Sequence, residues 1–325
     1  MSRKDSPFSI AMLLDGKGGG RDLSDGEVAN WQEGDGILWL DIDLTQDSGK
    51  QWLDNESGFN KSVLSILLAA ETRPRSLVEG DSLIVVMRGI NMNPGAVPDD
   101  MVAVRMALQQ NRILTTRRRT VLSVADLRDS LLAGNGPKSS GDFLVALTGF
   151  LSTRIESAVE NIENMVDDLD EKMADHETEN VRVTLGVIRR QAAAIRRHLA
   201  PQRDAIDRIA RSNIHLLTDR TIFELREEGD QLTRHIEDLD LARENALVTQ
   251  EELMNRVALE QNARMYLLSV VAAIFLPLTF ITGLLGMNVA GLPGTENPRG
   301  FIYSGLVMLA SLAGLVLYFR SRKWL

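Results

Sequence analysis

An amide side chain follows a long apolar stretch near the C-terminal end of the sequence. Gly286, Met287 and Asn288 directly follow the uncharged residues 266–285. A hydrated divalent cation gives up its water reluctantly, so a site that passes it can hold the hydration shell with neutral oxygens. The amide oxygen of Asn288 and nearby backbone carbonyls are suitable acceptors. In isolation, however, such a tripeptide is more often simply the end of a helix, where Gly and Asn are common.

Small or weakly polar side chains recur upstream of this tripeptide at helical spacing. They are Met265, Leu268, Ser269, Ala272, Leu276, Thr279 and Gly283, hereafter the small-residue stripe. Such a stripe can line a pore, but small residues are also the usual contacts between membrane helices. Two apolar segments per chain cannot enclose a channel, so several chains would have to supply the wall. On that ground we favour a shared pore over helix packing.

Two weaker signals concern metal binding in the rest of the chain. His235 and Asp238 have the i, i+3 spacing that places two ligands on one helix face, yet a closed zinc site needs about four ligands. A second set of acidic residues could concentrate cations near the cytoplasmic entrance of a pore. They are Asp167, Asp168, Asp170, Glu171 and Asp175. A solvated helix face accounts for both sets, so we assign no metal site to either.

Composition excludes several classes of function. The net charge of -9 argues against nucleic acid as a partner, because phosphate neutralisation needs a clustered basic surface. We read Arg117, Arg118 and Arg119 as surface charge. The absence of cysteine excludes disulfides and thiolate metal sites. The sequence also lacks a phosphate loop, a nucleophile with a nearby base and an HExxH motif. We therefore expect neither an enzyme nor an ATP-driven pump, and we expect no cofactor.

Two charge-free stretches, residues 266–285 and 300–319, are each long enough to cross a hydrocarbon core of about 30 Å. Arg256 and Arg264 precede the first stretch, and residues 320–323 after the second include three basic residues. Positive charge is enriched on the cytoplasmic side of membrane segments. We therefore expect a multi-pass protein of the cell inner membrane with both termini in the cytoplasm.

Long helices are predicted between residue 141 and the first stretch, because glycine and proline are rare there and apolar residues recur at helical spacing. We expect helices over residues 142–174 and 181–217, with a turn at 175–180. A third should run from about residue 218 through the first stretch to residue 285, roughly 100 Å at about 1.5 Å per residue.

The first 140 residues mix short apolar runs with Gly, Asp and Pro. Strands are predicted at residues 9–14, 36–42, 83–88, 101–108 and 112–116, and a helix at 61–70. The last two strands should be joined by a polar turn at residues 109–111. This pattern predicts an α/β domain of mixed connection.

The expected fold is therefore an α+β membrane protein. We divide it into a cytoplasmic α/β domain (1–140), a cytoplasmic helical hairpin (141–217), a stalk helix (218–265), a first transmembrane or pore helix (266–285), an outer loop (286–299), a second transmembrane helix (300–319) and a basic cytoplasmic tail (320–325).

The C-terminal half resembles the CorA superfamily of divalent-cation transporters. The family hallmark is Gly-Met-Asn at the outer end of the first of two C-terminal spans, which here is residues 286–288. Residues 275–281, the long preceding helix and the Lys323-Trp324-Leu325 terminus are also similar, and residues 72–75 resemble the family weakly. Residues 289–293 look most like the ZntB zinc-transporter branch, although Ala290 and Leu292 depart from its usual run.

The resemblance implies a funnel-shaped homo-oligomer, by family a pentamer, surrounded by membrane lipid. Asn288 would form an outer selectivity ring that binds metal through its hydration shell, with Gly286 and Met287 shaping the turn that presents it. The implied cargo is Zn²⁺ entering the cell, with protons as a possible coupling ion. A CorA-type channel for Mg²⁺, Co²⁺ or Ni²⁺ is the close alternative. A membrane-tethered helical scaffold fits the helical periodicity equally well, but it does not explain the tripeptide or the stripe.

Overall fold

The computed structural model describes residues 6–97, 99–174, 181–287 and 297–322. It divides into two compact units, Met1–Gln250 and Glu251–Leu325. The expected turn at 175–180, Asn288 and most of the expected outer loop lie outside the described residues.

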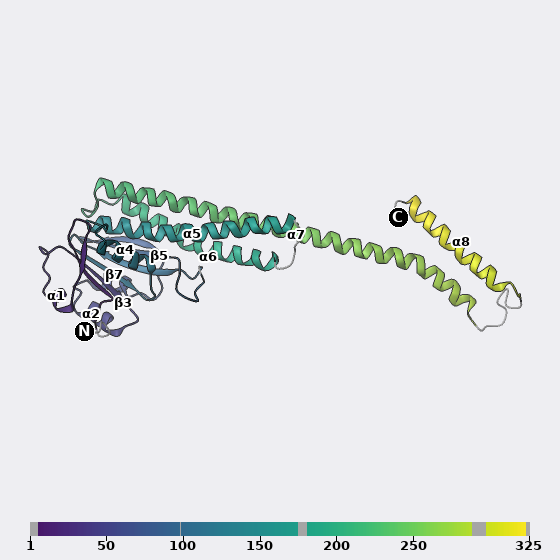
Figure 1. Ribbon diagram of the computed structural model, residues 1–325, viewed down its shortest axis with the longest axis horizontal. Coiled ribbons are helices and arrows are strands. Elements are labelled where there is room, and N and C mark those ends of the chain that lie inside the picture. Colours follow the sequence, from purple (N-terminus) through teal and green to yellow (C-terminus); the bar gives the residue numbers. More distant parts are fainter. Residues whose placement is uncertain (1–5, 98, 175–180, 288–296, 323–325) are drawn as a thin grey trace. The chain divides into compact units, whose positions relative to one another are not determined.

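The first unit contains a seven-stranded sheet with strand order β2-β1-β3-β7-β6-β5-β4 (Figure 1). The strands are β1 (Ile10–Leu14), β2 (Gly20–Asp22), β3 (Ile37–Asp43), β4 (Arg75–Glu79), β5 (Ser82–Gly89), β6 (Val102–Leu108) and β7 (Arg112–Arg117). Only β3 and β7 pair in parallel among these strands, and the other neighbours are antiparallel. The sheet is mixed, as the sequence predicted.

Helices cover both faces of this sheet, which explains why its central strands are buried along nearly their whole length. The short helices are α1 (Asp25–Ala29), α2 (Asp47–Asn55), α3 (Lys61–Leu67) and α4 (Leu122–Leu132). Leu38, Leu40 and Ile42 of β3 share a core cluster with Leu53 of α2 and Leu67 of α3. The alternate residues of β3 point to the other face, where the centroid of the Trp39 ring lies 5.0 Å from that of the Phe143 ring.

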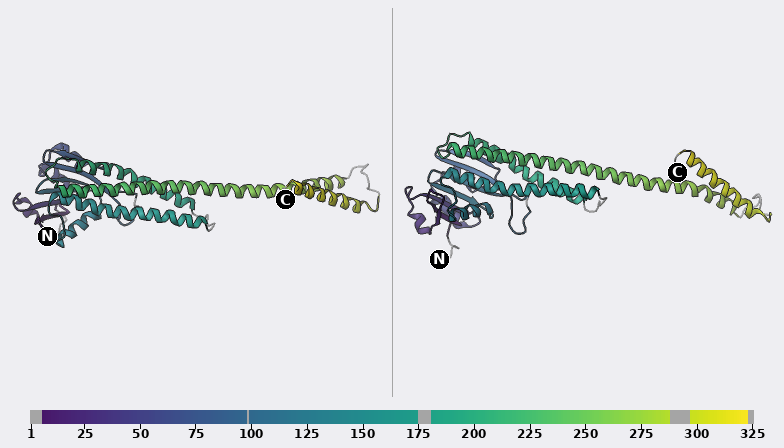
Figure 2. Two further views of the ribbon diagram at one scale, coloured as in Figure 1. Left: turned by 90° about the horizontal axis from the view of Figure 1, so that it is seen from above. Right: turned by 45° about the horizontal axis from the view of Figure 1, so that its top comes forward.

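Three long helices follow: α5 (Ser140–Ala174), α6 (Val181–Ala210) and α7 (Asp219–Leu285). Within the first unit α5, α6 and the beginning of α7 lie side by side, and α5 and α6 both contact β5 (Figures 1 and 2). Their buried residues recur three or four positions apart, as at Leu144, Leu147 and Leu151 of α5. This periodicity buries one face of each helix and leaves the opposite face to solvent.

The predicted helix over residues 181–217 was too long. α6 ends at Ala210, because the backbone there tightens into a turn in which the Ser212 amide donates to the Ile209 carbonyl at 2.9 Å. The Ser212 hydroxyl donates to the same carbonyl at 2.7 Å. Serine competes for backbone groups in this way and therefore favours helix ends. The predicted continuity of the third helix is confirmed, since α7 runs unbroken through Pro277.

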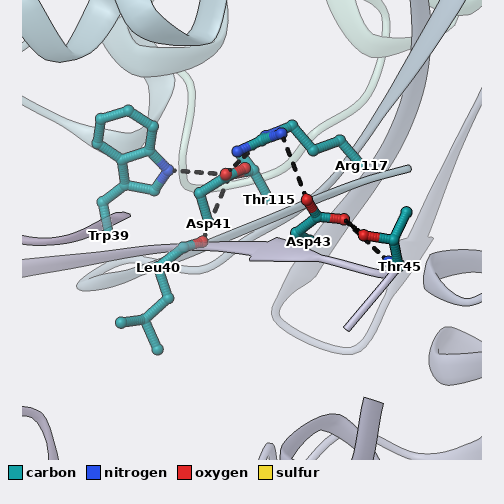
Figure 3. Close-up of polar contacts among 7 residues, drawn as sticks. All are labelled: Trp39, Leu40, Asp41, Asp43, Thr45, Thr115 and Arg117. Carbon is teal, nitrogen blue, oxygen red and sulfur yellow. Dashed lines mark hydrogen bonds and ion pairs between the residues drawn. The ribbon is translucent and has the colours of Figure 1, made fainter. Parts of the chain in front are cut away.

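A buried polar network ties the two parallel strands together (Figure 3). Arg117 Nε of β7 donates to Asp41 Oδ2 of β3 at 2.9 Å, and the Thr115 hydroxyl donates to Asp41 Oδ1 at 2.8 Å. Trp39 Nε1 in turn donates to Thr115 Oγ1 at 3.1 Å. Burial raises the pKa of Asp41, and the Arg117 charge opposes that rise. Arg117 is thus a partner of a buried carboxylate, which corrects its assignment to surface charge.

Candidate functional site

The two apolar helices of the second unit leave their large side chains uncovered. They are the last part of α7 and α8 (Gly300–Ser321), and each has the length and composition to cross a membrane. Each helix contains an apolar segment of 18 residues, and none of the residues in these two segments is buried within the described chain. Phe301 is 91% exposed and Leu276 is 75% exposed. Apolar surface on this scale requires lipid or other protein chains to cover it.

Several hydroxyl groups in these helices donate to carbonyls of their own helix. Thr279 Oγ1 donates to the Phe275 carbonyl at 2.8 Å, and Ser269 Oγ donates to the Met265 carbonyl at 2.8 Å. Each hydroxyl therefore donates its hydrogen bond within the helix, and its oxygen can still accept a hydrogen bond from an external partner. Such oxygens can accept hydrogen bonds from the water shell of a cation without stripping it.

The small-residue stripe lies on a face of α7 that the chain itself leaves open. All seven of its residues are exposed. The half-buried residues of the same segment are Val270, Ala273, Ile274, Pro277, Leu278 and Ile281. At roughly 100° per residue these six lie on nearly the opposite side of the helix. Packing against the chain's own second span therefore does not account for the stripe.

A matching half-buried face is present on α8. Ser304, Met308, Ser311 and Leu315 are partly covered and Phe319 is buried, at intervals of three or four residues. The two helices of one chain thus each have one shielded face. The stripe on α7 remains free for a lumen or for a neighbouring chain.

The tripeptide begins where α7 ends. The Gly286 amide donates to the Thr282 carbonyl at 2.9 Å, which completes the last helical turn after Leu285. Gly286 is not among the glycines with a left-handed backbone, so it does not form the usual left-handed glycine cap. Gly286 and Met287 are exposed, whereas Asn288 lies outside the described residues.

The described residues contain no group of three or more His, Asp and Glu side chains placed to hold a metal. His235 and Asp238 both lie on α7 in the first unit, where burial lowers the pKa of His235. Burial, with nearby Asp238 and Asp167, raises the pKa of Glu163 on α5. These carboxylates therefore crowd one another, but their arrangement is not a closed ligand set.

One feature of the first unit was missed from the sequence. Six arginines from distant segments line one cavity: Arg73, Arg88, Arg105, Arg118, Arg119 and Arg197. The run at residues 117–119 and the Thr72-Arg73-Pro74-Arg75 segment were the available signals. Neither indicated a cavity, because its walls come together only through sheet pairing and helix packing.

Comparison with known proteins assigns the chain to a family. The family model described as CorA-like Mg²⁺ transporter protein matches residues 34–322. The chain belongs to the CorA family. The expected family, fold class and divalent-cation transport are thereby confirmed, and CorA-family proteins are transporters rather than enzymes.

Several CorA-family proteins resemble the chain over nearly its full length. The divalent cation transporter CmaX of Pseudomonas aeruginosa is 35% identical and aligns over 96% of this chain and 95% of its own. The zinc transport protein ZntB of Pectobacterium carotovorum is 34% identical over 97% of this chain and 95% of its own.

Solved structures match in the same way. The structure of full-length CmaX has a TM-score of 0.84 at 33% identity and covers 98% of both chains. The CorA magnesium transporter from Methanocaldococcus jannaschii has a TM-score of 0.82 over 97% of this chain and 99% of its own. At 19% identity the latter supports the fold alone.

Proposed function

We propose that this CorA-family protein carries Zn²⁺ into the cell through a pore lined by the small-residue stripe of α7. The observation that carries the proposal is the exposure of the whole stripe on the face away from the shielded side of α7. Thr279 and Ser269 offer it neutral oxygens whose protons are already used within the helix. Neutral oxygens suit a cation that keeps its hydration shell.

Several copies of the chain must build this pore, because two spans cannot surround a lumen. We propose a homopentamer set in the lipid of the inner membrane, with Asn288 of each copy in an outer ring. Weak amide dipoles would add up in such a ring and hold the cation through water. Gly286 and Met287, which follow α7 directly, would present Asn288 to the lumen.

Zinc is the proposed cargo because relatives at 34% identity and below bear the name zinc transport protein ZntB. The name of CmaX refers to divalent cations in general, and the family description refers to Mg²⁺. Neutral ligands discriminate poorly among hydrated divalent ions. We therefore expect Co²⁺, Ni²⁺ and Mg²⁺ to compete with Zn²⁺ to measurable degrees.

A proton relay within the spans would need an ionisable carboxylate or imidazole, and residues 266–285 and 300–319 contain none. Proton coupling, if it operates, would use protons that pass through the same pore or groups in the cytoplasmic unit. Zinc flux into protein-loaded liposomes, measured with and without an imposed pH gradient and repeated with Mg²⁺, separates these cases. Gradient-independent flux with a strong preference for Mg²⁺ would reassign the protein as a magnesium channel.

The same liposomes test the role of the amide side chain. Asn288→Ala should abolish selectivity or flux while the particle mass stays unchanged. Asn297→Ala, in the same outer loop, is the control for loss of an asparagine outside the proposed ring. Unchanged zinc flux in Asn288→Ala would exclude the tripeptide from the mechanism.

A further inference from the structure

The first unit contains a cavity of about 670 Å³, hereafter the arginine cavity. Arg88 of β5 and Arg105 of β6 enter it from the sheet, and Arg197 reaches it from α6. Arg73, Arg118 and Arg119 line it from the connecting segments. The carboxylates in its wall are Glu71 and Asp100, so arginines outnumber acids by six to two.

Arg105 is the deepest of these cations and is incompletely bonded. It is 1% exposed, and Nη2 donates to the carbonyl of Ala69 at 2.7 Å. Its Nε and Nη1 groups have no hydrogen-bond partner among the described residues. Burial, together with Arg118 and Arg88, lowers the pKa of Arg105 to about 10, so it stays charged at neutral pH. Buried charged donors without partners are costly and uncommon in folded proteins.

The other cations of the cavity do not relieve this charge. The Arg88 guanidinium donates hydrogen bonds to backbone carbonyls. Its Nη2 donates to the Thr72 carbonyl at 2.9 Å, and its Nη1 donates to the Met101 carbonyl at 2.8 Å. Carbonyl groups satisfy hydrogen bonds but carry no net negative charge. Asp100 already pairs with Arg119. Glu71 and Asp100 offset part of the charge of Arg88. Only cations act on Arg105, so its charge is not neutralised by a carboxylate of the described chain.

His198 responds to the same field. It is 7% exposed on α6, and its Nδ1 atom has no partner in the part of the chain that the structure describes. Burial and then the charges of Arg88, Arg197 and Arg73 lower the pKa of His198 to about 4. A neutral imidazole among arginines can still donate one hydrogen bond to a ligand through its N–H.

We propose that the arginine cavity binds a small phosphorylated anion, whose phosphate oxygens accept hydrogen bonds from the free Nε and Nη1 groups of Arg105. Guanidinium groups match the geometry and charge of phosphate oxygens better than any other side chain. The cavity volume lies within the range of small-molecule sites, roughly 300–1,000 Å³. The excess of positive charge suits a diphosphate group better than a single monovalent anion.

An acidic segment of a second copy is the competing occupant. The depth of Arg105 argues against it, because a carboxylate would have to reach a side chain that is only 1% exposed. Nε and Nη1 of Arg105 are themselves covered, so a small anion requires the guanidinium to shift toward the cavity, which is a smaller rearrangement than insertion of a segment of another chain. The site is also separate from the proposed permeation pathway, since all its residues lie in the first unit.

Calorimetric titration of the full-length protein in detergent with pyrophosphate tests the proposal. The buffer should contain EDTA, because pyrophosphate would otherwise bind free divalent cations. Sulfate at matched ionic strength serves as the reference anion. We expect saturable binding of pyrophosphate that is tighter than that of sulfate. Absence of binding by the folded, assembled protein overturns the proposal, and this is the result expected if a second copy's acidic residues occupy the cavity.

Variants place the binding in the cavity. Arg105→Met should weaken pyrophosphate binding by roughly tenfold or more, as expected for the loss of charged hydrogen bonds. If that variant does not fold, the exposed pair Arg73→Ala and Arg118→Ala gives the same test without a buried change. Arg208→Ala, an exposed arginine on α6 outside the cavity wall, is the matched control. Equal binding by the cavity variants and the control would overturn the proposal, whatever the outcome of the zinc flux measurements.

Discussion

At the scale of single residues, the carboxylate of Asp41 shows how one side chain can join two strands that are distant in sequence. It accepts from Thr115 and Arg117 of β7, and Thr115 accepts from Trp39 of the same strand as Asp41. A fully buried charge of this kind is tolerated because it is paired and hydrogen-bonded at both oxygens.

Asp41→Ala should strongly destabilise the cytoplasmic unit. Arg117 would be left without its buried partner, and removal of one member of a buried pair costs about 3–5 kcal/mol. Thermal unfolding followed by tryptophan fluorescence provides the measurement. Asp43→Ala is the control, because its carboxylate is partly exposed and lies 3.9 Å from Arg117 Nη1. If Asp41→Ala unfolds at the same temperature as the unsubstituted protein, the buried contacts of Asp41 in Figure 3 contribute little to stability.

Thr279 offers a residue-scale test of the pore face with an internal control. Thr279 and Thr282 both lie on α7, and each donates its hydroxyl proton to a carbonyl of the same helix. Only Thr279 belongs to the small-residue stripe. Thr279→Val removes one acceptor per chain without changing side-chain shape, so zinc flux should fall by up to about tenfold, while Thr282→Val should leave it unchanged. Equal effects in liposome flux would place the lumen on another face.

At the scale of elements, the orientation of the two spans rests on charge rather than on packing. Basic residues precede the apolar part of α7 and follow that of α8, and the basic side of a span faces the cytoplasm. On this basis we predict that both termini lie in the cytoplasm and that the loop between the two spans lies on the outer side of the membrane.

Tags reveal this orientation in intact cells. A tag before Met1 and a tag after Leu325 should both resist added protease, whereas a tag inserted near residue 295 should be cut. Lysed cells provide the control, since all three tags should then be digested. Accessibility of one terminus but not the other would mean an odd number of spans.

At the scale of the whole molecule, the proposed pore requires more than one chain, because two spans cannot surround a lumen. An isolated copy would leave Thr279 and Ser269 without a shared aqueous lumen. The purified protein in mild detergent should therefore be a closed homo-oligomer, which we expect to contain five copies. Mass measurement of the particle, with the detergent contribution subtracted, decides the number. A monomer or dimer under these conditions would contradict the pore proposal.

The sequence by itself determined the features that depend on local pattern. Two uncharged stretches of spanning length, the helical periodicity that follows residue 141 and most of the strands are readable because each depends on residues close in the chain. The continuity of α7 followed in the same way, since no stop signal interrupts it and Pro277 is accommodated within the helix. The end of α6 was misplaced because turn formation at Ser212 depends on local hydrogen bonds that periodicity does not register.

Only the tertiary structure decided which groups from distant segments meet. Residues 117–119 are identical in type, yet Arg117 pairs with Asp41 whereas Arg118 and Arg119 face the arginine cavity. Their different surroundings depend on the pairing of β3 with β7 and on the packing of α6 against the edge of the sheet. Likewise, the sequence gives the stripe on α7 its spacing, but only the covered face of the folded helix shows that the stripe stays open. Such contacts join positions far apart in the chain, and periodicity carries no information about them.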